Sequence, residues 1–165
     1  MNVVLYPSEN LHVPCRQVEK FDHGLRTTVA SMVDTMYASS GVGLAAPQIG
    51  IQERLVVIDP SAGQKANDLV TLVNPKITWR SSSSEMGLEG CLSLPGITVN
   101  ISRPTEVEIE YQDVLGQTHH NFFTGWPARV VQHEIDHLDG VLMIDRASPM
   151  EHKMALKNVS KIVRV

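Results

Sequence analysis

The sequence predicts an α+β fold, in which antiparallel strands lie between separate helices. Three observations predict it: an apolar helical stripe in residues 22–39, short β-rich segments between residues 54 and 123, and a second apolar helical run that ends before Gly140. The strands are grouped and do not alternate regularly with helices, so a parallel βαβ arrangement is not indicated. A length of 165 residues suits one domain, which we expect to span residues 1–165.

The first helix is predicted over residues 22–39 because apolar side chains recur there at helical spacing. One face collects Leu25, Val29, Met32, Val33 and Met36. The next segment, Gly41–Gly50 (GVGLAAPQIG), is too rich in glycine and proline for a regular element, so we expect a loop. Residues Ser81–Ser84 (SSSS) predict a second, exposed loop between two strands.

Strands are predicted from short runs of β-branched and aromatic residues. Residues 54–58 (RLVVI) and 69–73 (LVTLV) are typical of buried strands. Residues 106–111 (EVEIEY) alternate between polar and apolar side chains, which indicates a strand with one wet face. A turn at residues 113–116 and a returning strand at residues 118–123 would complete a hairpin.

Two further helices are predicted near the C-terminus. One begins near Pro127, with Thr124 as its N-cap, and ends at Gly140. The other begins at Ser148-Pro149, where the serine and Glu151 have the spacing of a capping box and the proline occupies the first helical position.

Composition excludes several classes of protein. A net charge of −4 gives the chain no global positive field, so we expect no specific nucleic-acid partner. The sequence offers no apolar run of membrane-spanning length and no signal peptide at its start, so we expect no membrane partner. Cytoplasmic location is the expectation, and an organellar form would require that a transit peptide had been removed. Cys15 and Cys91 do not make a disulfide framework, so we expect free thiols.

The strongest chemical signal is HEIDH, residues 133–137, inside an apolar helical run. His133 and His137 are four residues apart and share one helix face, so both can bind a single ion. Glu134 lies about 100° round the helix from His133, close enough to act on water bound to that ion. The alternative for the motif alone is two half-buried histidines on a helix that faces the core.

Such a metal site needs a third protein ligand and an open position for water. Metzincin proteases place a third histidine where this chain has Met143, so that class is disfavoured. Thermolysin-like proteases use a glutamate about 20 residues further along. Glu151 lies only 14 residues past His137 and is already expected at the start of a helix.

Cys91, within LEGCLSLPG, is the remaining candidate for the third ligand. A thiolate is a good ligand for borderline and soft divalent metals. Gly90 and a turn at Pro95-Gly96 would allow the backbone to approach a ligand closely. The alternative for an isolated cysteine is a small buried hydrophobic residue.

Three segments taken together resemble the signature motifs of the peptide deformylase family. They are GVGLAAPQIG (41–50), EGCLSLP (89–95) and QHEIDH (132–137), in that family's order and at compatible separations. The resemblance implies antiparallel β-sheets packed around a central HExxH helix, with N-terminal and C-terminal helices. It also implies a metal-dependent hydrolase that removes the formyl group from the N-terminal formyl-methionine of newly made proteins and releases formate.

The resemblance assigns roles to single residues. The residues that match the metal ligands, with water as the fourth ligand, are Cys91, His133 and His137. Glu134 matches the general acid/base, while the side chain of Gln48 and the backbone N–H of Leu92 match the groups that stabilise the oxyanion. The family metal is usually ferrous iron, which we expect here, and Zn2+, Ni2+ or Co2+ can substitute.

The resemblance also locates a binding site for N-formylmethionyl nascent peptides. The residues whose backbone matches the part that pairs with an extended substrate are Val42, Gly43, Leu44 and Gly90. We interpret Trp126 and Arg129 as walls of the methionine pocket, against the alternative of ordinary packing and a solvated charge. Arg103 is a weaker candidate for contact with the substrate backbone.

Other polar residues carry weaker signals. We assign to structure or surface the histidines outside the motif, which are His12, His23, His119, His120 and His152. The last helix carries four basic residues, Lys153, Lys157, Lys161 and Arg164. In the bacterial family a basic C-terminal helix can dock on the ribosome near the exit tunnel; the alternative, a solvated helical face, is the interpretation we favour.

Two other functions compete with deformylation. A metallopeptidase that cuts internal bonds would need a third histidine or glutamate ligand downstream, and the sequence offers no suitable one. A non-catalytic, peptide-binding relative would have lost Glu134, Cys91 or Gln48, and all three are present.

Overall fold

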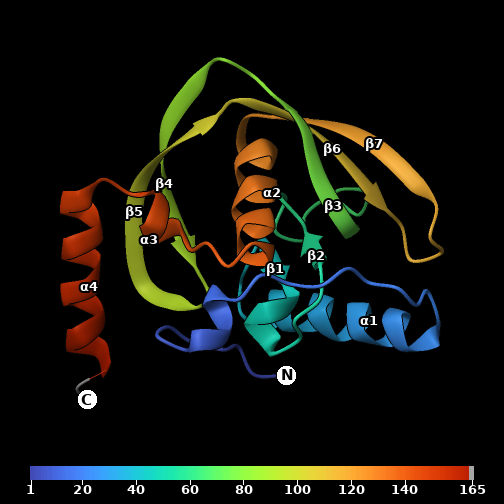
Figure 1. The fold of residues 1–165 in the computed structure, drawn as a ribbon, viewed down its shortest axis with the longest axis horizontal. Coiled ribbons are helices and arrows are strands. Elements are labelled where there is room, and N and C mark those ends of the chain that lie inside the picture. Colours follow the sequence, from blue (N-terminus) through green and yellow to red (C-terminus); the bar gives the residue numbers. More distant parts are fainter. Residues whose placement is uncertain (164–165) are drawn as a thin grey trace.

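The computed structural model describes the backbone of residues 1–163 and the side chains of residues 1–159. Two antiparallel sheets lie on either side of the central helix α2 (Gly125–Leu138), as Figure 1 shows. One sheet has five strands in the order β1-β2-β3-β6-β7, and the other consists of β4 and β5. The predicted α+β class, with sheets packed around the HExxH helix, is confirmed.

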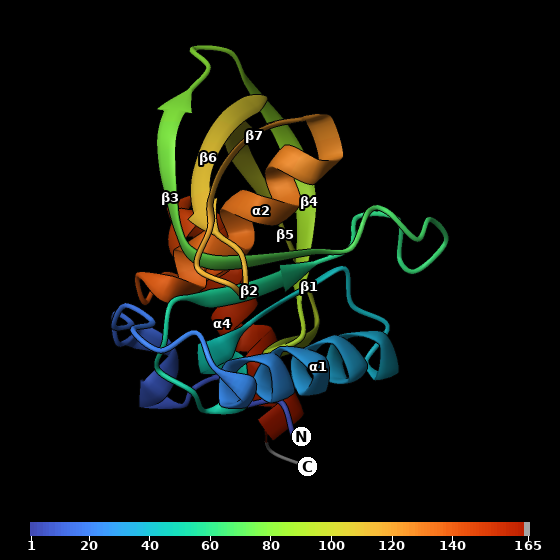
Figure 2. The ribbon, with the colours of Figure 1, turned by 90° about the vertical axis from the view of Figure 1, so that its right-hand side faces the viewer.

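The elements follow one another along the chain with these bounds: η1 (Glu9–His12), α1 (His23–Ala38), β1 (Gly43–Ala45), η2 (Ala46–Ile49), β2 (Leu55–Ile58), β3 (Val70–Arg80), β4 (Ser84–Cys91), β5 (Leu94–Pro104), β6 (Glu106–Gln112), β7 (Thr118–Thr124), α2 (Gly125–Leu138), α3 (Met143–Arg146) and α4 (Pro149–Val163). Figure 2 shows α1 beneath the strands β1 and β2, on the opposite side of these strands from α2. Within residues 1–163, none of the helices combines the length and the apolar character that crossing a membrane requires.

The first helix and the hairpin agree with the sequence patterns. Helix α1 is capped by Asp22, whose carboxylate accepts a hydrogen bond from the backbone N–H of Leu25 at 3.0 Å. Its apolar face packs against the buried residues of β1 and β2. In the β6–β7 hairpin, the carboxylate of Asp113 accepts hydrogen bonds from two backbone N–H groups of the turn, and the predicted alternation places every second residue of β6 in the core.

Two predictions for the segment around the first motif and the β4–β5 hairpin are wrong. Residues 41–50 are not irregular, because Gly43–Ala45 pairs with β2 as an edge strand and residues 46–49 form one 3-10 turn. The predicted turn at Pro95-Gly96 lies inside β5, and the chain reverses at Leu92-Ser93 instead. Strands β4 and β5, which the sequence analysis did not name, form a long hairpin. The alternation of residues 97–103 (ITVNISR) places Ile97, Val99 and Ile101 against α3 and α4.

The helix boundaries near the C-terminus differ from prediction in detail. Helix α2 begins at Gly125, two residues before Pro127, and the side chain of its N-cap Thr124 makes no capping hydrogen bond. Helix α4 begins at Pro149 as predicted, and the hydroxyl of Ser148 accepts from the N–H of Glu151 at 3.2 Å. The predicted capping box is half wrong, because the carboxylate of Glu151 accepts from the N–H of Asn100 in β5 at 3.0 Å. This bond attaches α4 to the small sheet.

Candidate active site

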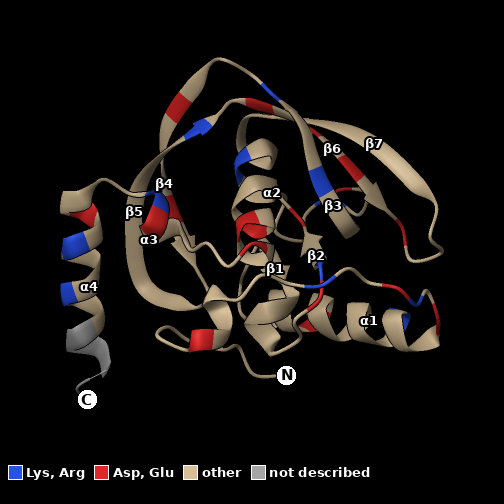
Figure 3. Cartoon of the chain, in the orientation of Figure 1, with Lys and Arg blue, Asp and Glu red and all other residues tan. Residues whose placement is uncertain are grey.

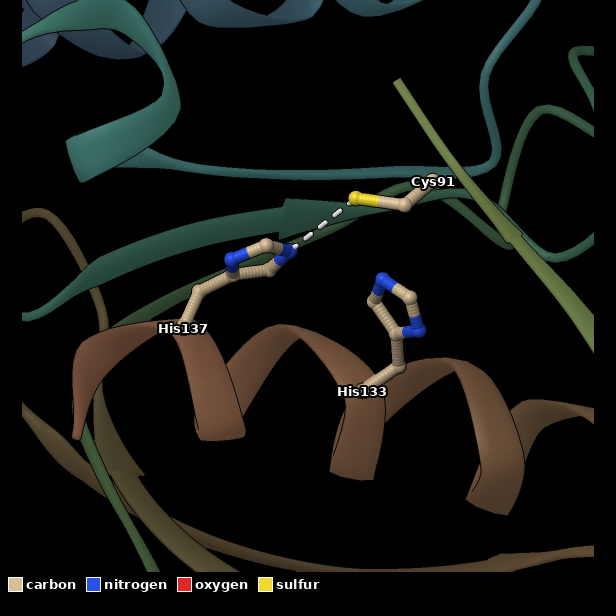
Figure 4. Close-up of side chains that lie close together, drawn as sticks. All are labelled: Cys91, His133 and His137. Atoms are coloured by element: carbon tan, nitrogen blue, oxygen red, sulfur yellow. Dashed lines mark hydrogen bonds between the residues drawn. The ribbon is translucent and has the colours of Figure 1, made fainter. Parts of the chain in front are cut away.

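Three candidate ligands meet between α2 and the end of β4. His133 and His137 lie one turn apart on α2, and their rings stand edge to face with centroids 5.2 Å apart. Cys91, the last residue of β4, points at the same space, with Sγ 3.5 Å from Nε2 of His137 (Figure 4). One ligand atom of each residue lies within 4.8 Å of the other two.

The local structure explains why Cys91 reaches the helix. The pairing of β4 with β5 shifts register between Gly90 and Cys91, and such an irregularity redirects the side chain that follows it. The tight reversal at Leu92-Ser93 then starts β5. The strand therefore delivers its terminal thiol towards α2.

The donor set and its surroundings fit a divalent transition metal. Two imidazoles and one thiol are ligands that suit iron, zinc, nickel or cobalt. Burial, together with the positive charges of His133 and Arg103, holds the pKa of His137 well below its ordinary value, so this imidazole is in the neutral form that binds a metal. Burial also lowers the pKa of His133, but hydrogen bonds with Cys91 and Glu89 outweigh it and raise that pKa well above its ordinary value.

Glu89 orients the first histidine of the motif. Its carboxylate lies 2.8 Å from Nδ1 of His133, so Nε2 of that ring is directed at the metal position. Burial alone would raise the pKa of Glu89, but hydrogen bonds from Arg103 and His133 lower it to about 2. Glu89 is therefore a carboxylate at every working pH, and it keeps His133 in one tautomer and one orientation.

A buried ion network continues from Glu89 to the next turn of α2. The guanidinium of Arg103 donates to both carboxylate oxygens of Glu89, at 2.5 and 2.9 Å, and to Asp136 at 2.9 Å. Asp136 also accepts two hydrogen bonds from Arg146. The guanidinium of Arg103 is engaged in this network, and its predicted contact with the substrate backbone stays a prediction.

Trp126 and Arg129 line one small pocket. Together with Met86 and Gly87 they border a hollow of about 210 Å³ between α2 and the β4–β5 hairpin. Arg129 is not a solvated charge, because its guanidinium donates to Glu89 and to two carbonyls of the hairpin, those of Glu85 and Ile101. Their part in a methionine pocket stays a prediction.

The carboxylate of Glu134 is enclosed beside the ligands. It is only 5% exposed, and among the residues described in the structure its Oε2 has no hydrogen-bond partner. A Cβ on Gly43 would lie 2.7 Å from Oε1, so β1 closes over the carboxylate. Burial raises the pKa of Glu134 to about 7, which suits a group that accepts and returns a proton near neutral pH.

Gln48 is fixed from both ends of its amide. Its Oε1 accepts from the N–H of Ala45 at 3.0 Å, and its Nε2 lies 3.1 Å from the hydroxyl of Ser93 and 3.6 Å from Sγ of Cys91. Leu92 follows the ligand cysteine, and a Cβ at Gly41 would lie 2.9 Å from its side chain. The Gly41–Gly50 segment is thus held against the β4–β5 turn.

The remaining candidates flank this space on two edge strands. Gly43 and Leu44 belong to β1, which occupies one edge of the five-stranded sheet, and Val42 precedes it with its carbonyl bonded to the N–H of Asp59. Gly90 lies in β4 of the two-stranded sheet. These backbone segments lie on strands at sheet edges, and their pairing with an extended substrate stays a prediction.

The other histidines lie outside the cluster, as predicted. His119 contacts Asp113 and stacks on Tyr111. His152 lies 2.6 Å from the carbonyl oxygen of Ile144. The other three are His12 beside Tyr6, His23 beside Thr27 and His120 between Glu108 and Glu110. Both cysteines are free thiols, as expected. Two larger hollows, of about 890 and 610 Å³, contain none of the candidate site residues.

Sequence reasoning missed Glu89, Ser93 and Asp136. All three lie in or beside the motifs that it singled out, and two of them are acids in otherwise apolar surroundings. An acidic residue on the buried side of a helix or beside a ligand cysteine is a signal that a partner cation lies opposite.

Known proteins share both this sequence and this fold. The family described as "Polypeptide deformylase" matches residues 1–153. The peptide deformylase of Thermotoga neapolitana is 44% identical over 149 residues, covering 90% of this chain and 88% of that protein, and that of Thermodesulfovibrio yellowstonii is 39% identical over 157 residues, covering 95% and 94%. Among solved structures, the peptide deformylase of Plasmodium falciparum has a TM-score of 0.94 at 35% identity, covering 99% of this chain and 95% of that one. A peptide deformylase from Synechococcus elongatus in complex with actinonin has a TM-score of 0.93 at 38% identity, covering 97% and 88%.

Proposed function

Because the chain belongs to the polypeptide deformylase family, we propose that it hydrolyses the formamide at the N-terminal formyl-methionine of newly made proteins. Formate and a free N-terminal amine are the products. The observation that carries the proposal is the cluster of Cys91, His133 and His137 beside the enclosed carboxylate of Glu134. The whole chain, residues 1–165, is proposed to act as one catalytic domain.

The enzyme is metal-dependent, and Cys91, His133 and His137 are the residues that would hold the ion. A divalent ion held there supplies a nucleophile at neutral pH by lowering the pKa of water, and it polarises the formyl carbonyl. We propose Fe2+ as the physiological ion, with Zn2+, Ni2+ or Co2+ able to substitute, since all four suit the donor set. Metal analysis of protein purified without oxygen would identify the ion.

Glu134 is proposed to move the proton. Its carboxylate accepts the proton that water loses on attack, and it then gives that proton to the nitrogen of the leaving amine. Its Oε2, which has no hydrogen-bond partner among the described residues, is the atom we propose for this transfer. A pKa of about 7 allows the same group to act first as base and then as acid.

Gln48 and Leu92 are proposed to stabilise the oxyanion. As the formyl carbon becomes tetrahedral, its oxygen gains negative charge and needs preorganised donors. The side-chain N–H of Gln48 lies 3.6 Å from Sγ of Cys91, and the amide is held by hydrogen bonds at both ends. Leu92 follows Cys91 in the chain. An oxyanion donor of this kind is typically worth about 100-fold to 1,000-fold in kcat.

The substrate is proposed to lie extended between β1 and β4. Val42, Gly43 and Leu44 would pair with one side of the peptide and Gly90 with the other, while Trp126 and Arg129 would border the methionine side chain. Support comes from the positions of these residues on two edge strands and around one pocket.

Formate release from a formyl-Met peptide tests the function directly. We expect the metal-loaded protein to release formate, and we expect Glu134→Gln to lose about 100-fold or more of kcat while it keeps its metal. Cleavage of an internal peptide bond would favour the metallopeptidase alternative. Peptide binding without formate release would favour a non-catalytic relative.

The location of the enzyme is proposed to be cytoplasmic, at the site of protein synthesis. Helix α4 carries exposed Lys153 and Lys157, visible as blue segments in Figure 3, whereas the side chain of Lys161 and all of Arg164 lie outside the described residues. A solvated helical face is the interpretation we favour, and docking on the ribosome is the alternative. Co-sedimentation with ribosomes, compared between the wild type and a Lys153→Glu/Lys157→Glu double variant, distinguishes the two.

A further inference from the structure

A buried hydroxyl connects the N-terminal segment to the amide of Gln48. Ser93, in the reversal between β4 and β5, is 0% exposed. Its Oγ lies 2.7 Å from the carbonyl oxygen of Val4 and 3.1 Å from Nε2 of Gln48. The backbone holds this arrangement together, because the N–H of Val4 donates to the carbonyl of Gln48 and the N–H of Tyr6 donates to the carbonyl of Ser93.

The chemistry of these groups allows only one direction for the hydrogen bonds. A carbonyl oxygen can only accept, so the single hydroxyl hydrogen of Ser93 must go to Val4. The same hydroxyl can then only accept from Gln48, so the side of that amide facing Ser93 must be the NH2 group. At the other end of the amide, the N–H of Ala45 can only donate, which requires the carbonyl oxygen there.

This orientation determines which atom of Gln48 faces the reaction. The NH2 group has two hydrogens, and the bond to Ser93 uses one of them. The other hydrogen points towards Sγ of Cys91, which accepts at 3.6 Å, so this N–H faces the proposed metal site. We propose that the formyl oxygen develops its charge beside that site. A flipped amide would present an oxygen there and would repel the oxyanion that it should stabilise.

We propose that Ser93 is a positioning residue for deformylation, whose hydroxyl, anchored on the carbonyl of Val4, keeps the N–H of Gln48 directed at the reacting carbonyl. The inference rests on the proposed function, since it assigns Ser93 a role through Gln48. It also makes the first residues of the chain a support for the active site.

A double-mutant cycle tests the proposal in metal-loaded protein. Ser93→Ala should lower kcat by about 10-fold with KM changed less than about 2-fold, because the amide keeps one anchor at Ala45 and loses the other. Gln48→Ala should lower kcat by about 100-fold or more, and adding Ser93→Ala to it should have almost no further effect. An equal loss from Ser93→Ala in both backgrounds, or an unchanged kcat in the single variant, would overturn the proposal.

A readout independent of activity separates this proposal from the proposed function. In zinc-loaded, 15N-labelled protein, the Gln48 side-chain amide signals can be assigned by their loss in Gln48→Ala. We expect slow exchange of these hydrogens with water in the wild type and markedly faster exchange in Ser93→Ala. Unchanged exchange would contradict the positioning role, while absent formate release with normal amide protection would contradict only the proposed function.

The matched control removes a buried hydroxyl elsewhere. Thr35 on α1 is 7% exposed, and its hydroxyl donates to the carbonyl of Ser31 at 2.8 Å. Thr35→Val should leave kcat, metal content and the Gln48 signals unchanged. Thermal unfolding and metal content, measured for every variant, exclude a general loss of structure as the cause of the kinetic effect.

Discussion

The carboxylate of Glu134 works in an enclosure that a single glycine makes possible. Strand β1 runs directly over the carboxylate, and only a residue without a side chain allows this approach at Gly43. Any side chain there has to move either the acid/base group or the backbone proposed to bind substrate. The motif GVGLAAPQIG therefore carries a steric requirement as well as a chemical one.

Gly43→Ala should impair catalysis far more than stability. The new Cβ would lie 2.7 Å from Oε1 of Glu134, so the carboxylate must shift by a few tenths of an ångström or more. A misplaced catalytic group can cost up to about 100-fold in rate, so we expect kcat to fall by roughly 10-fold to 100-fold. Steady-state formate release measures kcat of this variant and of the wild type. Gly24→Ala, at the start of α1 and away from the site, should leave kcat unchanged; a wild-type kcat in Gly43→Ala would contradict the crowding argument.

Cys15 should be nearly inert as a thiol in the folded protein. It is buried beside Leu138, and burial raises the pKa of its thiol from 9.0 to about 11. Only the thiolate reacts, so at pH 8 a rise of two pKa units reduces the reactive fraction by about 100-fold. In a Cys91→Ser variant Cys15 is the remaining cysteine of the chain. The rate at which iodoacetamide labels it can be compared between folded protein in buffer and unfolded protein in urea. The same shift makes stability depend on pH. The thiol ionises near pH 9 in the unfolded chain but only near pH 11 in the folded protein, so the free energy of unfolding falls as the pH rises from 9 to about 11. Equal labelling rates in the two conditions would refute the burial effect.

The packing of α2 against the small sheet depends on buried charge as well as on apolar contact. Arg103 of β5 forms ion pairs with Glu89 of β4 and with Asp136 of α2. Arg129 of α2 forms a further ion pair with Glu89. The two strands and the helix are thereby held in one register. Since Glu89 also orients His133, the same network sets the geometry of the metal ligands.

Arg103→Met should destabilise the protein strongly. It would take from Glu89 the cation that donates to both of its carboxylate oxygens, and Arg129 would remain as the partner of one of them. Asp136 would lose one of its two arginine partners and keep Arg146. Breaking a buried ion pair costs about 3–5 kcal/mol, and we expect a loss of this order. Urea unfolding of the metal-loaded protein measures the loss. The control is Arg16→Met, because Arg16 pairs with Glu53 while its side chain is 77% exposed, and there we expect less than about 1 kcal/mol. Similar losses in the two variants would show that burial of the network matters little.

The elements that the sequence predicted well are those with their own periodicity. Helix α1 has an apolar stripe and an N-cap, and the β6–β7 hairpin has alternation and a turn, so local rules suffice. Strand β4 has neither, because its outward side chains include Met86 and Leu88 and only Glu89 is buried. Its strand conformation comes from pairing with β5, which no local pattern contains.

The candidate site was predictable only as far as its motifs carried chemistry. Cys91, His133 and Glu134 could be named because three motifs taken together resemble those of the peptide deformylase family. The role of Arg103 could not, since its carboxylate partners Glu89 and Asp136 lie 14 and 33 residues away in the sequence. From the sequence alone, an arginine that precedes a proline is expected at the surface, whereas Arg103 is buried in the folded protein.

On the scale of the whole molecule, the fold brings the site together from separate elements. Gln48, Cys91 and His133 come from three separate elements and converge through packing of two sheets on one helix. Three buried apolar clusters connect these layers. We therefore expect this chain to fold on its apolar core, unlike a small domain that a metal must hold together.

Removal of the metal should accordingly lower stability without unfolding the chain. Chelated protein should keep its far-UV circular dichroism at 25 °C, because the apolar clusters do not depend on an ion. Zinc at about 1,000 times its dissociation constant should stabilise the fold by about 4 kcal/mol. For a chain of this size that raises the midpoint of thermal unfolding by roughly 10 °C. In Cys91→Ser most of this rise should disappear, since one of the three ligands is lost. Unfolding on chelation would mean that the ion organises the core, and an undiminished rise in Cys91→Ser would remove Cys91 from the ligand set.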